Sequence, residues 1–310
     1  MSGILIIHQG ALGDFIALFP AILRLKRKFP RVDAVCQDKL GKMSAALGVT
    51  DNFFPAESAL FASLYSDTVL PKLNTILRSY DQIILFSYSQ ETEHAIKAVT
   101  ENPVHRIRPR ATVFEPVHIT EHILSNLMKC GLLENSDTVL SYPDTRDKGY
   151  DPKKILIHPG SGSRRKNWPV SDFIKTEAIL RADGLLPEFI IGPAEEFLKS
   201  ALQDDSRRTV HLISDLTELA GLLRTAGGFI GNDAGVSHLA AFIGLPTAAV
   251  FGPSDPIRWR PSGRAVTVLR PADLDCRGPC FEVSKNNCEK PDCLRTLPET
   301  VIKAFYSLCT

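Results

Sequence analysis

Asp233, Gly235 and His238 are the residues best spaced for chemistry, because they follow an apolar run, 228–231, that is typical of a buried strand. Aspartate is a frequent N-cap residue, and an apolar helix is predicted after it over 234–243. The first N–H groups of a helix lack carbonyl partners within it, and with the helix dipole they attract phosphate. This pattern predicts an anion site, with His238 as a further donor. The alternative is an ordinary capped core helix with one hydrogen-bonded histidine.

A second stretch, 159–169, also suits an anion. It follows a strand predicted over 154–158, and it contains two glycines, two serines and three cations, among them Ser161 and Lys166. A loop that brings N–H groups, hydroxyls and positive charge to the start of a helix favours phosphate binding. It is not a Walker A loop, because no Gly-Lys-Ser or Gly-Lys-Thr sequence runs into the helix. A solvated basic loop is the alternative.

The N-terminal region carries a third strand–loop–helix pattern. A strand is predicted over 4–8, and one continuous helix over 15–28. The loop between them has the spacing G-x-x-G-D, from Gly10 to Asp14, which differs from the G-x-G-x-x-G of dinucleotide-binding enzymes. Asp14 therefore stands at the mouth of a helix, where its simplest role is that of an N-cap.

The rest of the chain alternates strands and helices, which indicates an α/β protein. In the first half the clearest elements are a strand over 81–86 and a helix over 120–130. The polar stretch 141–154 contains two prolines and a glycine and is predicted to link two domains. The second half continues with helix 171–182 capped by Ser171, strand 188–191, helix 193–203, a short strand near Val210, helix 215–226 and strand 247–251.

Three arginines, Arg106, Arg108 and Arg110, occupy alternating positions. If the backbone there is extended, all three side chains point to the same side. Such a row could grip an anionic acceptor molecule. A charged edge strand or loop is the alternative.

Composition excludes several classes of protein. The chain has 310 residues, 44% hydrophobic and 23% charged, with a formal net charge of +1, so no global field favours nucleic acid. The sequence suggests neither a signal peptide nor an uninterrupted apolar run of about 18 residues, so a cytoplasmic location is expected. Seven cysteines in that compartment are expected to be reduced. Four lie in the tail at Cys276, Cys280, Cys288 and Cys293, with looser spacing than zinc sites show.

The motifs together resemble glycosyltransferase family 9, the ADP-heptose:lipopolysaccharide heptosyltransferases. The family pattern Asp-(Ser/Thr)-Gly-x-x-His, followed by Gly-x-Pro and (aromatic)-Gly-Pro-(Ser/Thr)-x-Pro, matches the stretch 233–256. One position departs, because Ala234 replaces the family hydroxyl and can offer only its backbone N–H. The loop before Trp168-Pro169 resembles the second motif, and Gly10 to Asp14 the N-terminal one.

The resemblance implies a GT-B fold, an α/β architecture of two Rossmann-like domains facing across a cleft. Residues 1–145 would form the acceptor-side domain and 154–297 the nucleotide-sugar domain. The final segment, 298–310, would be a helix that crosses back to the first domain.

The resemblance also implies roles for individual residues. Asp14 corresponds to the proposed catalytic base, Lys166 to a contact of the donor diphosphate, and Glu196 to a ribose ligand. Independently of the resemblance, the alternating spacing makes Arg106, Arg108 and Arg110 the candidates for acceptor binding. The full expected donor-binding set is Gly13, Ser161, Lys166, Glu196, Ser214, Asp233, Ala234, Gly235 and His238.

The expected activity is an inverting, metal-independent transfer of a sugar, heptose from ADP-heptose above all. The acceptor would be a lipopolysaccharide core or related glycan at the cytoplasmic face of the inner membrane, and no resident cofactor is expected. Two alternatives remain open: a sugar-nucleotide-binding protein without catalysis, which Ala234 favours, and a nucleotide-sugar epimerase of the same fold. The pair Glu188 and Glu196 imitates the E-x7-E spacing of retaining enzymes, and Asp273-Leu274-Asp275 imitates a metal-binding DxD. Both are interpreted as chance.

Overall fold

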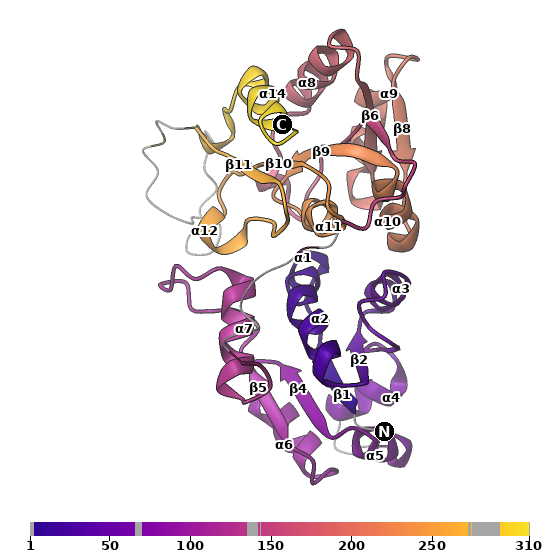
Figure 1. Cartoon of the computed structure of the whole chain (residues 1–310), viewed down its shortest axis with the longest axis vertical. Coiled ribbons are helices and arrows are strands. Elements are labelled where there is room, and N and C mark those ends of the chain that lie inside the picture. Colours follow the sequence, from indigo (N-terminus) through magenta and orange to yellow (C-terminus); the bar gives the residue numbers. More distant parts are fainter. Residues whose placement is uncertain are drawn as a thin grey trace. The chain divides into compact units, whose positions relative to one another are not determined.

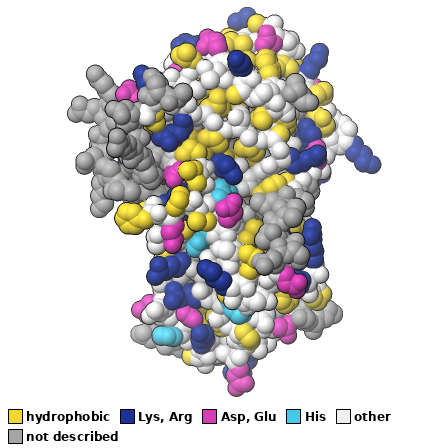
Figure 2. All heavy atoms as spheres, turned by 60° about the vertical axis from the view of Figure 1, so that its left-hand side comes forward, with side chains coloured by type: hydrophobic (Ala, Val, Ile, Leu, Met, Phe, Trp, Pro, Cys, Tyr) yellow, Lys and Arg dark blue, Asp and Glu magenta, His cyan; other side chains and the backbone are white. Residues whose placement is uncertain are grey.

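The computed structural model describes residues 3–65, 70–134, 142, 144–271, 274 and 292–309. The chain folds into two compact units, drawn as ribbons in Figure 1 and as spheres in Figure 2. The first comprises residues 1–112 and 119–140, and the second comprises 113–118 and 141–310. The division at 140/141 lies at the start of the predicted linker, whereas the grouping of 113–118 with the second unit has no counterpart in the sequence pattern.

The first unit is built on a five-stranded sheet in which every neighbouring pair is parallel. Its strands are β1 Gly3–His8, β2 Arg31–Cys36, β3 Phe53–Pro55, β4 Gln82–Phe86 and β5 Val104–Ile107. They lie in the order β3-β2-β1-β4-β5. The central strand, β1, is buried along its whole length, which explains its unbroken apolar sequence.

Helices connect these strands, as parallel pairing requires. They are α1 Leu12–Ile16, α2 Phe19–Lys28, α3 Asp38–Ala46, α4 Ala59–Ala62, α5 Pro71–Arg78, α6 Gln90–Lys97 and α7 Ile119–Lys129, with a 3₁₀ turn, η1, over Ser63–Tyr65. Leu5 and Ile7 of β1 pack in a core cluster with side chains of α4, α5 and α6. Helices α2 and α7 pack against each other.

The single helix predicted over 15–28 is wrong, because the structure contains two. α1 ends at Ile16 and α2 begins at Phe19. Pro20 lies in the first turn of α2, where its missing N–H costs nothing, whereas inside a continuous helix it would remove a hydrogen bond and clash with the preceding turn.

The second unit contains a six-stranded parallel sheet. Its strands are β6 Asp151–His158, β7 Leu186–Ile191, β8 Thr209–Leu212, β9 Ala226–Asn232, β10 Thr247–Val250 and β11 Val266–Leu269. The order β11-β10-β9-β6-β7-β8 is that of the doubly wound Rossmann sheet, and the first unit has the same order with one strand fewer. In both sheets the winding direction reverses beside the first strand, between β1 and β4 and between β6 and β9.

Helices pack on this sheet in two groups. The helical elements are α8 Val170–Ala182, α9 Lys199–Gln203, α10 Leu216–Arg224, α11 Gly235–Ile243, α12 Pro256–Trp259 and α14 Pro298–Tyr306, with 3₁₀ turns η3 Arg164–Lys166, η4 Pro193–Leu198 and η5 Asp292–Leu294. Side chains of α8, α9 and α14 share one core cluster with β6, β7 and β10 (Figure 1). Helices α10 and α11 pack against each other, and α11 also packs on β9 and β10.

The last helix differs from the expectation that it crosses back to the first domain. The apolar residues of α14, Val301, Ile302 and Phe305, are buried in the core of the second unit. Phe305 lies so close to β9 that a Cβ on Gly228 would come within 2.4 Å of its ring. The apolar face of α14 is therefore covered within the second unit, where the helix packs on α8 and β10.

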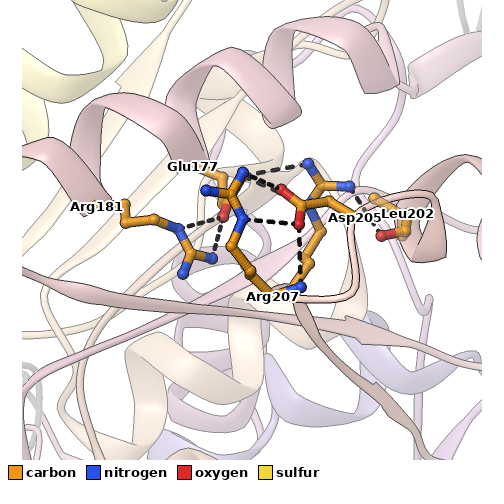
Figure 3. A network of polar contacts seen from close by, with 6 residues as sticks. Glu177, Arg181, Leu202, Asp205 and Arg207 are labelled. Atoms are coloured by element: carbon orange, nitrogen blue, oxygen red, sulfur yellow. Dashed lines mark hydrogen bonds and ion pairs between the residues drawn. The ribbon is translucent and has the colours of Figure 1, made fainter.

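A buried charge network fastens α8 to the segment that leads into β8 (Figure 3). The Glu177 carboxylate, on α8, accepts hydrogen bonds from Arg181 and Arg208. Arg208 also donates to the carbonyl of Leu202 at 2.8 Å. Because Glu177 is buried and has two cationic partners, the network is structural, and losing both partners would leave an uncompensated buried charge.

Among the helices that the structure describes, none combines the length and the apolar character that crossing a bilayer demands.

Candidate functional site

The switch point of the second sheet lies between β6 and β9, and ligands of doubly wound sheets bind outside the carboxyl ends of the strands at such a point. His158, the last residue of β6, pairs with Gly231, the penultimate residue of β9. The loop 159–169 and the start of α11 therefore leave the sheet side by side. The two anion-binding patterns predicted from the sequence form one site.

Asn232 fastens the loop to this point. Its side chain is fully buried, its Oδ1 accepts a hydrogen bond from the Trp168 N–H at 2.9 Å, and its Nδ2 donates to the carbonyls of Pro159 at 2.8 Å and Gly160 at 3.2 Å. Both ends of the loop are thus held by one amide. Asparagine, like aspartate, is a frequent N-cap residue, but nothing in the local sequence shows that the partners of Asn232 lie more than sixty residues away.

The N-cap of α11 is Ala234, with extended backbone and no side-chain cap hydrogen bond, so the prediction of an aspartate cap is wrong. Asp233 instead turns its carboxylate to Lys166, with an Nζ–Oδ2 distance of 3.1 Å and side-chain exposures of 16% and 7% for lysine and aspartate. At the other end of α11 the predicted glycine stop is confirmed, because Gly244 adopts φ of 110°.

The loop is ordered by its own side chains. Ser161 Oγ lies 2.6 Å from both the Ser163 carbonyl and Asn167 Oδ1, so this hydroxyl already has partners within the loop. The guanidinium of Arg164 stacks on Phe197 at 4.1 Å from the ring centroid. Lys166 brings a positive charge close to the first turn of α11 through its pair with Asp233.

A buried acid–histidine pair supports the loop from η4. Glu195 Oε2 lies 3.9 Å from His158 Nε2 and accepts the Gly192 N–H at 3.0 Å. Burial opposes ionisation of this carboxyl, but its contacts with His158 and Gly192 outweigh burial and lower the pKa of Glu195. Gly160 is required here, because a Cβ would lie 2.1 Å from Glu195 Cγ. Sequence analysis missed Glu195.

The remaining expected donor residues lie in varied surroundings. Glu196 and Ser214 are exposed, at η4 and just before α10. His238 is buried in α11, and the hydroxyl of Ser237 beside it bonds the Asn232 carbonyl. Gly13 belongs to α1, in the first unit. The structure therefore brings Lys166, Asp233, Ala234, Gly235 and Ser161 together around one strand end.

Asp14 lies in the first turn of α1, beyond the end of β1. It is not the N-cap, which is Ala11 and makes no side-chain cap hydrogen bond, so the capping role considered for Asp14 is wrong. Its carboxylate is held by both arms of Arg110, with Nε 3.1 Å from Oδ1 and Nη2 2.8 Å from Oδ2. Because β1 is the first strand of its sheet, as β6 is of the other, Asp14 corresponds in place to the loop after β6, whereas Asp233 follows β9 on the opposite side of its switch point.

His8, the last residue of β1, is buried close to Asp14. Burial lowers the pKa of His8 to about 4, with the nearby Asp14 opposing this change and Arg110 adding to it. Its Nδ1 accepts the Gly10 N–H at 3.2 Å, so the neutral ring carries its proton on Nε2. A Cβ on Gly10 would lie 2.5 Å from His8 Cε1 and 2.9 Å from Asp14 Cβ, which explains the glycine.

The prediction that the three arginine side chains point to the same side is wrong. β5 ends at Ile107, so the backbone is a strand at only the first of the three positions. Arg106 pairs with Glu93 at 2.6 Å, Arg108 is exposed, and Arg110 pairs with Asp14. Their side chains serve different partners.

Most of the cysteine-rich tail lies outside the described residues, as do Asp273 and Asp275 of the DxD-like triplet. Cys293 is described, and its side chain is buried in the core of the second unit. Glu188 lies within β7, where it pairs with His211 at 2.8 Å. Within the described ranges no group of three or more His, Cys, Asp and Glu side chains is placed to hold a metal ion.

Comparison with known proteins identifies the family to which the chain is similar. The family model described as glycosyltransferase family 9 (heptosyltransferase) matches residues 132–290, about half of the chain. Lipopolysaccharide heptosyltransferase 3 of Escherichia coli is 29% identical over 162 residues, which is 46% of this chain and 46% of that protein. The matched region thus spans about half the length of this curated relative.

Solved structures extend the likeness to the whole chain. The family 9 glycosyltransferase of Veillonella parvula matches with a TM-score of 0.76 at 20% identity, over 99% of this chain and 97% of that one. The E. coli heptosyltransferase WaaC, solved with ADP, matches with a TM-score of 0.70 at 16% identity, over 99% of each. The likeness confirms the predicted GT-B fold.

Proposed function

The chain belongs to glycosyltransferase family 9, and we propose that it is an enzyme that transfers a sugar from a nucleoside diphosphate donor, preferably ADP-heptose, to a glycan acceptor. The observation that carries the proposal is the Lys166 ammonium at the mouth of α11, beside a loop that Asn232 holds in place. The donor assignment draws on the ADP bound by WaaC and on the heptosyltransferase names of the relatives.

Donor binding follows from the charges at this mouth. The first-turn N–H groups of α11, at Gly235 and Val236, have no carbonyl partner within the helix and favour an anion. Lys166 would exchange Asp233 for a phosphate oxygen, which offers an ammonium a comparable charge-assisted hydrogen bond. Ala234 contributes its backbone N–H alone. These groups stabilise the negative charge that develops on the departing diphosphate.

The transfer step needs a base for the acceptor hydroxyl, and we assign this role to Asp14 in the first unit. The hydroxyl oxygen forms a bond to the anomeric carbon while the bond from that carbon to the diphosphate oxygen breaks. The electron pair leaves with the nucleoside diphosphate, and the hydroxyl proton passes to Asp14. A single displacement of this kind inverts the anomeric centre.

We infer that the reaction proceeds without a metal ion, because Lys166 and the α11 N–H groups can supply the charge that a divalent cation provides in other glycosyltransferases. The relatives' names support a lipopolysaccharide acceptor. We place that acceptor at the cytoplasmic face of the inner membrane, where the protein would bind peripherally.

Release of ADP from ADP-heptose, measured with chelator present, tests the proposal. We expect release that depends on an acceptor, lipopolysaccharide with a truncated core, and a product of inverted configuration by NMR. UDP-, GDP- and dTDP-sugars serve as donor controls. Binding without release would favour the non-catalytic alternative, which Ala234 keeps open. Isomerisation of the nucleotide sugar without acceptor would favour the epimerase.

A further inference from the structure

We propose that Arg110 recognises an anionic group of the acceptor, a phosphate or carboxylate near the attacked hydroxyl. When the Arg110 side chain moves from Asp14 to this group, the Asp14 carboxylate is released to act as base. The inference rests on the proposed function and concerns the same site. Instead of a row of three arginines, the acceptor is recognised by Arg110 alone, which pairs either with Asp14 or with the anionic group of the acceptor.

The first support is the geometry of the Arg110–Asp14 pair. A base must come within hydrogen-bond reach of the proton that it removes. In the structure each carboxylate oxygen of Asp14 receives one arm of the guanidinium, at 3.1 and 2.8 Å. With this fork in place the carboxylate is engaged on both oxygens, so a substrate hydroxyl must compete with two charge-assisted hydrogen bonds.

The second support is the difference between Arg110 and Arg106. The Arg106 side chain projects from β5, is 21% exposed and bonds Glu93, which Lys97 also bonds. Arg110 lies three residues beyond the end of β5, outside any strand or helix, and its side chain is 48% exposed. Because about half of the Arg110 side chain is exposed, solvent and salt screen the pair, and a phosphate, which also accepts a bidentate guanidinium, can compete with Asp14 for Arg110.

The third support is the charge balance around Asp14. The low pKa of His8 keeps its ring neutral near pH 7, so His8 supplies no positive charge to the carboxylate. When Arg110 leaves, the Asp14 carboxylate therefore loses both hydrogen bonds of the guanidinium and becomes accessible to a hydroxyl.

This arrangement would protect the donor. Without acceptor, the fork keeps Asp14 from activating water, so the nucleotide sugar is not hydrolysed. An acceptor that carries an anion opens the fork when it arrives, whereas a neutral glycan does not. The substrate class is therefore an anionic glycan.

The experiment measures ADP release from ADP-heptose without acceptor. Arg110→Gln should raise this hydrolysis about 3- to 10-fold, the scale of one partly exposed ion pair. Asp14→Asn combined with Arg110→Gln should abolish the increase. Inorganic sulfate, which can occupy Arg110, should stimulate the wild type but not Arg110→Gln. The matched control is Arg78→Gln, because Arg78 lies in the same unit and the described contact of its side chain is a hydrogen bond to the Val99 backbone carbonyl.

A second readout uses two acceptors, a phosphorylated core glycan and the same glycan after phosphatase treatment. The wild type should prefer the phosphorylated form in kcat/KM, and Arg110→Gln should lose that preference mainly through a higher KM. Hydrolysis at the wild-type rate in Arg110→Gln, or an unchanged preference, would overturn the inference while leaving transfer intact. Absence of ADP release from every variant and the wild type would instead overturn the proposed function, and the inference with it.

Discussion

Asp233 and Asp14 each follow a strand that borders the switch point of its sheet, Asp233 after β9 and Asp14 after β1, yet their surroundings differ. Each acid lies at the start of a helix that follows a strand at the switch point, and each pairs with a cation from a distant part of its own unit. The Lys166–Asp233 pair is largely buried, in a loop held by Asn232. The Arg110–Asp14 pair has a half-exposed arginine on an irregular segment. On our proposal, the Lys166–Asp233 pair belongs to a preorganised anion site, whereas the Arg110–Asp14 pair can exchange its partners.

The difference suits two tasks. A leaving group is stabilised best by charges that are already oriented, because such charges need no rearrangement as the bond breaks. A base that must serve one class of acceptor gains specificity if its carboxylate becomes available only when the correct group displaces a partner. Both sites need a glycine for the same reason. A Cβ on Gly160 would collide with Glu195, and a Cβ on Gly10 would collide with His8 and Asp14.

The largest effect is expected at Asp14. Asp14→Asn should lower turnover by about 10²- to 10⁴-fold, the usual contribution of a general base. Because Asp14 is not a cap and its ion pair is partly exposed, the melting temperature should change little. Steady-state kinetics with a competent acceptor check this, and turnover within about threefold of wild type would remove Asp14 from the base role.

The buried His8, close to Asp14, should make the unfolding free energy depend on pH. The folded state keeps His8 neutral down to a pKa of about 4, whereas the unfolded chain takes up a proton below about 6.5. The unfolding free energy should therefore fall as pH drops through this window, by at most about 3 kcal/mol. Urea unfolding of His8→Asn should show a flatter pH dependence between pH 6.5 and 4. An identical slope in variant and wild type would contradict this account.

Two glycines of one loop sharpen the claim that the second site is rigid. Gly160→Ala would place a Cβ 2.1 Å from Glu195 Cγ, whereas a Cβ on Gly162 meets nothing within 4 Å. We expect Gly160→Ala to cost about 1–3 kcal/mol of stability and to weaken nucleotide binding, since a buried side chain must move. Gly162→Ala is the control and should be close to neutral. Equal behaviour of the two variants would argue for a mobile loop.

The sequence predicted the architecture well because the signals are local. Apolar runs such as 4–8 and 228–231 lie in buried strands, and Gly244 ends its helix as its type suggests. The joint between strand and helix at 232–235 was placed correctly, although its cap was not. Pro20 carried the signal for a break between α1 and α2, which the apolar spacing outweighed.

The partners within the site could not be predicted in the same way. Lys166 and Asp233 are 67 residues apart, and Arg110 and Asp14 are 96 apart. Nothing in local spacing shows such contacts, and Asn232 and Glu195 were missed for the same reason. The last helix shows a related limit: periodicity marked its apolar face, but the surface that the face covers is decided by packing.

The most direct test of the division between the two units is calorimetric titration of ADP, with chelator present, into the wild type, Lys166→Ala and Asp14→Asn. The account predicts that Lys166→Ala weakens binding by about 1–3 kcal/mol, the scale of a charge-assisted hydrogen bond, while Asp14→Asn binds like the wild type. Equal losses in the two variants, unchanged affinity in Lys166→Ala, or binding that requires magnesium would contradict it.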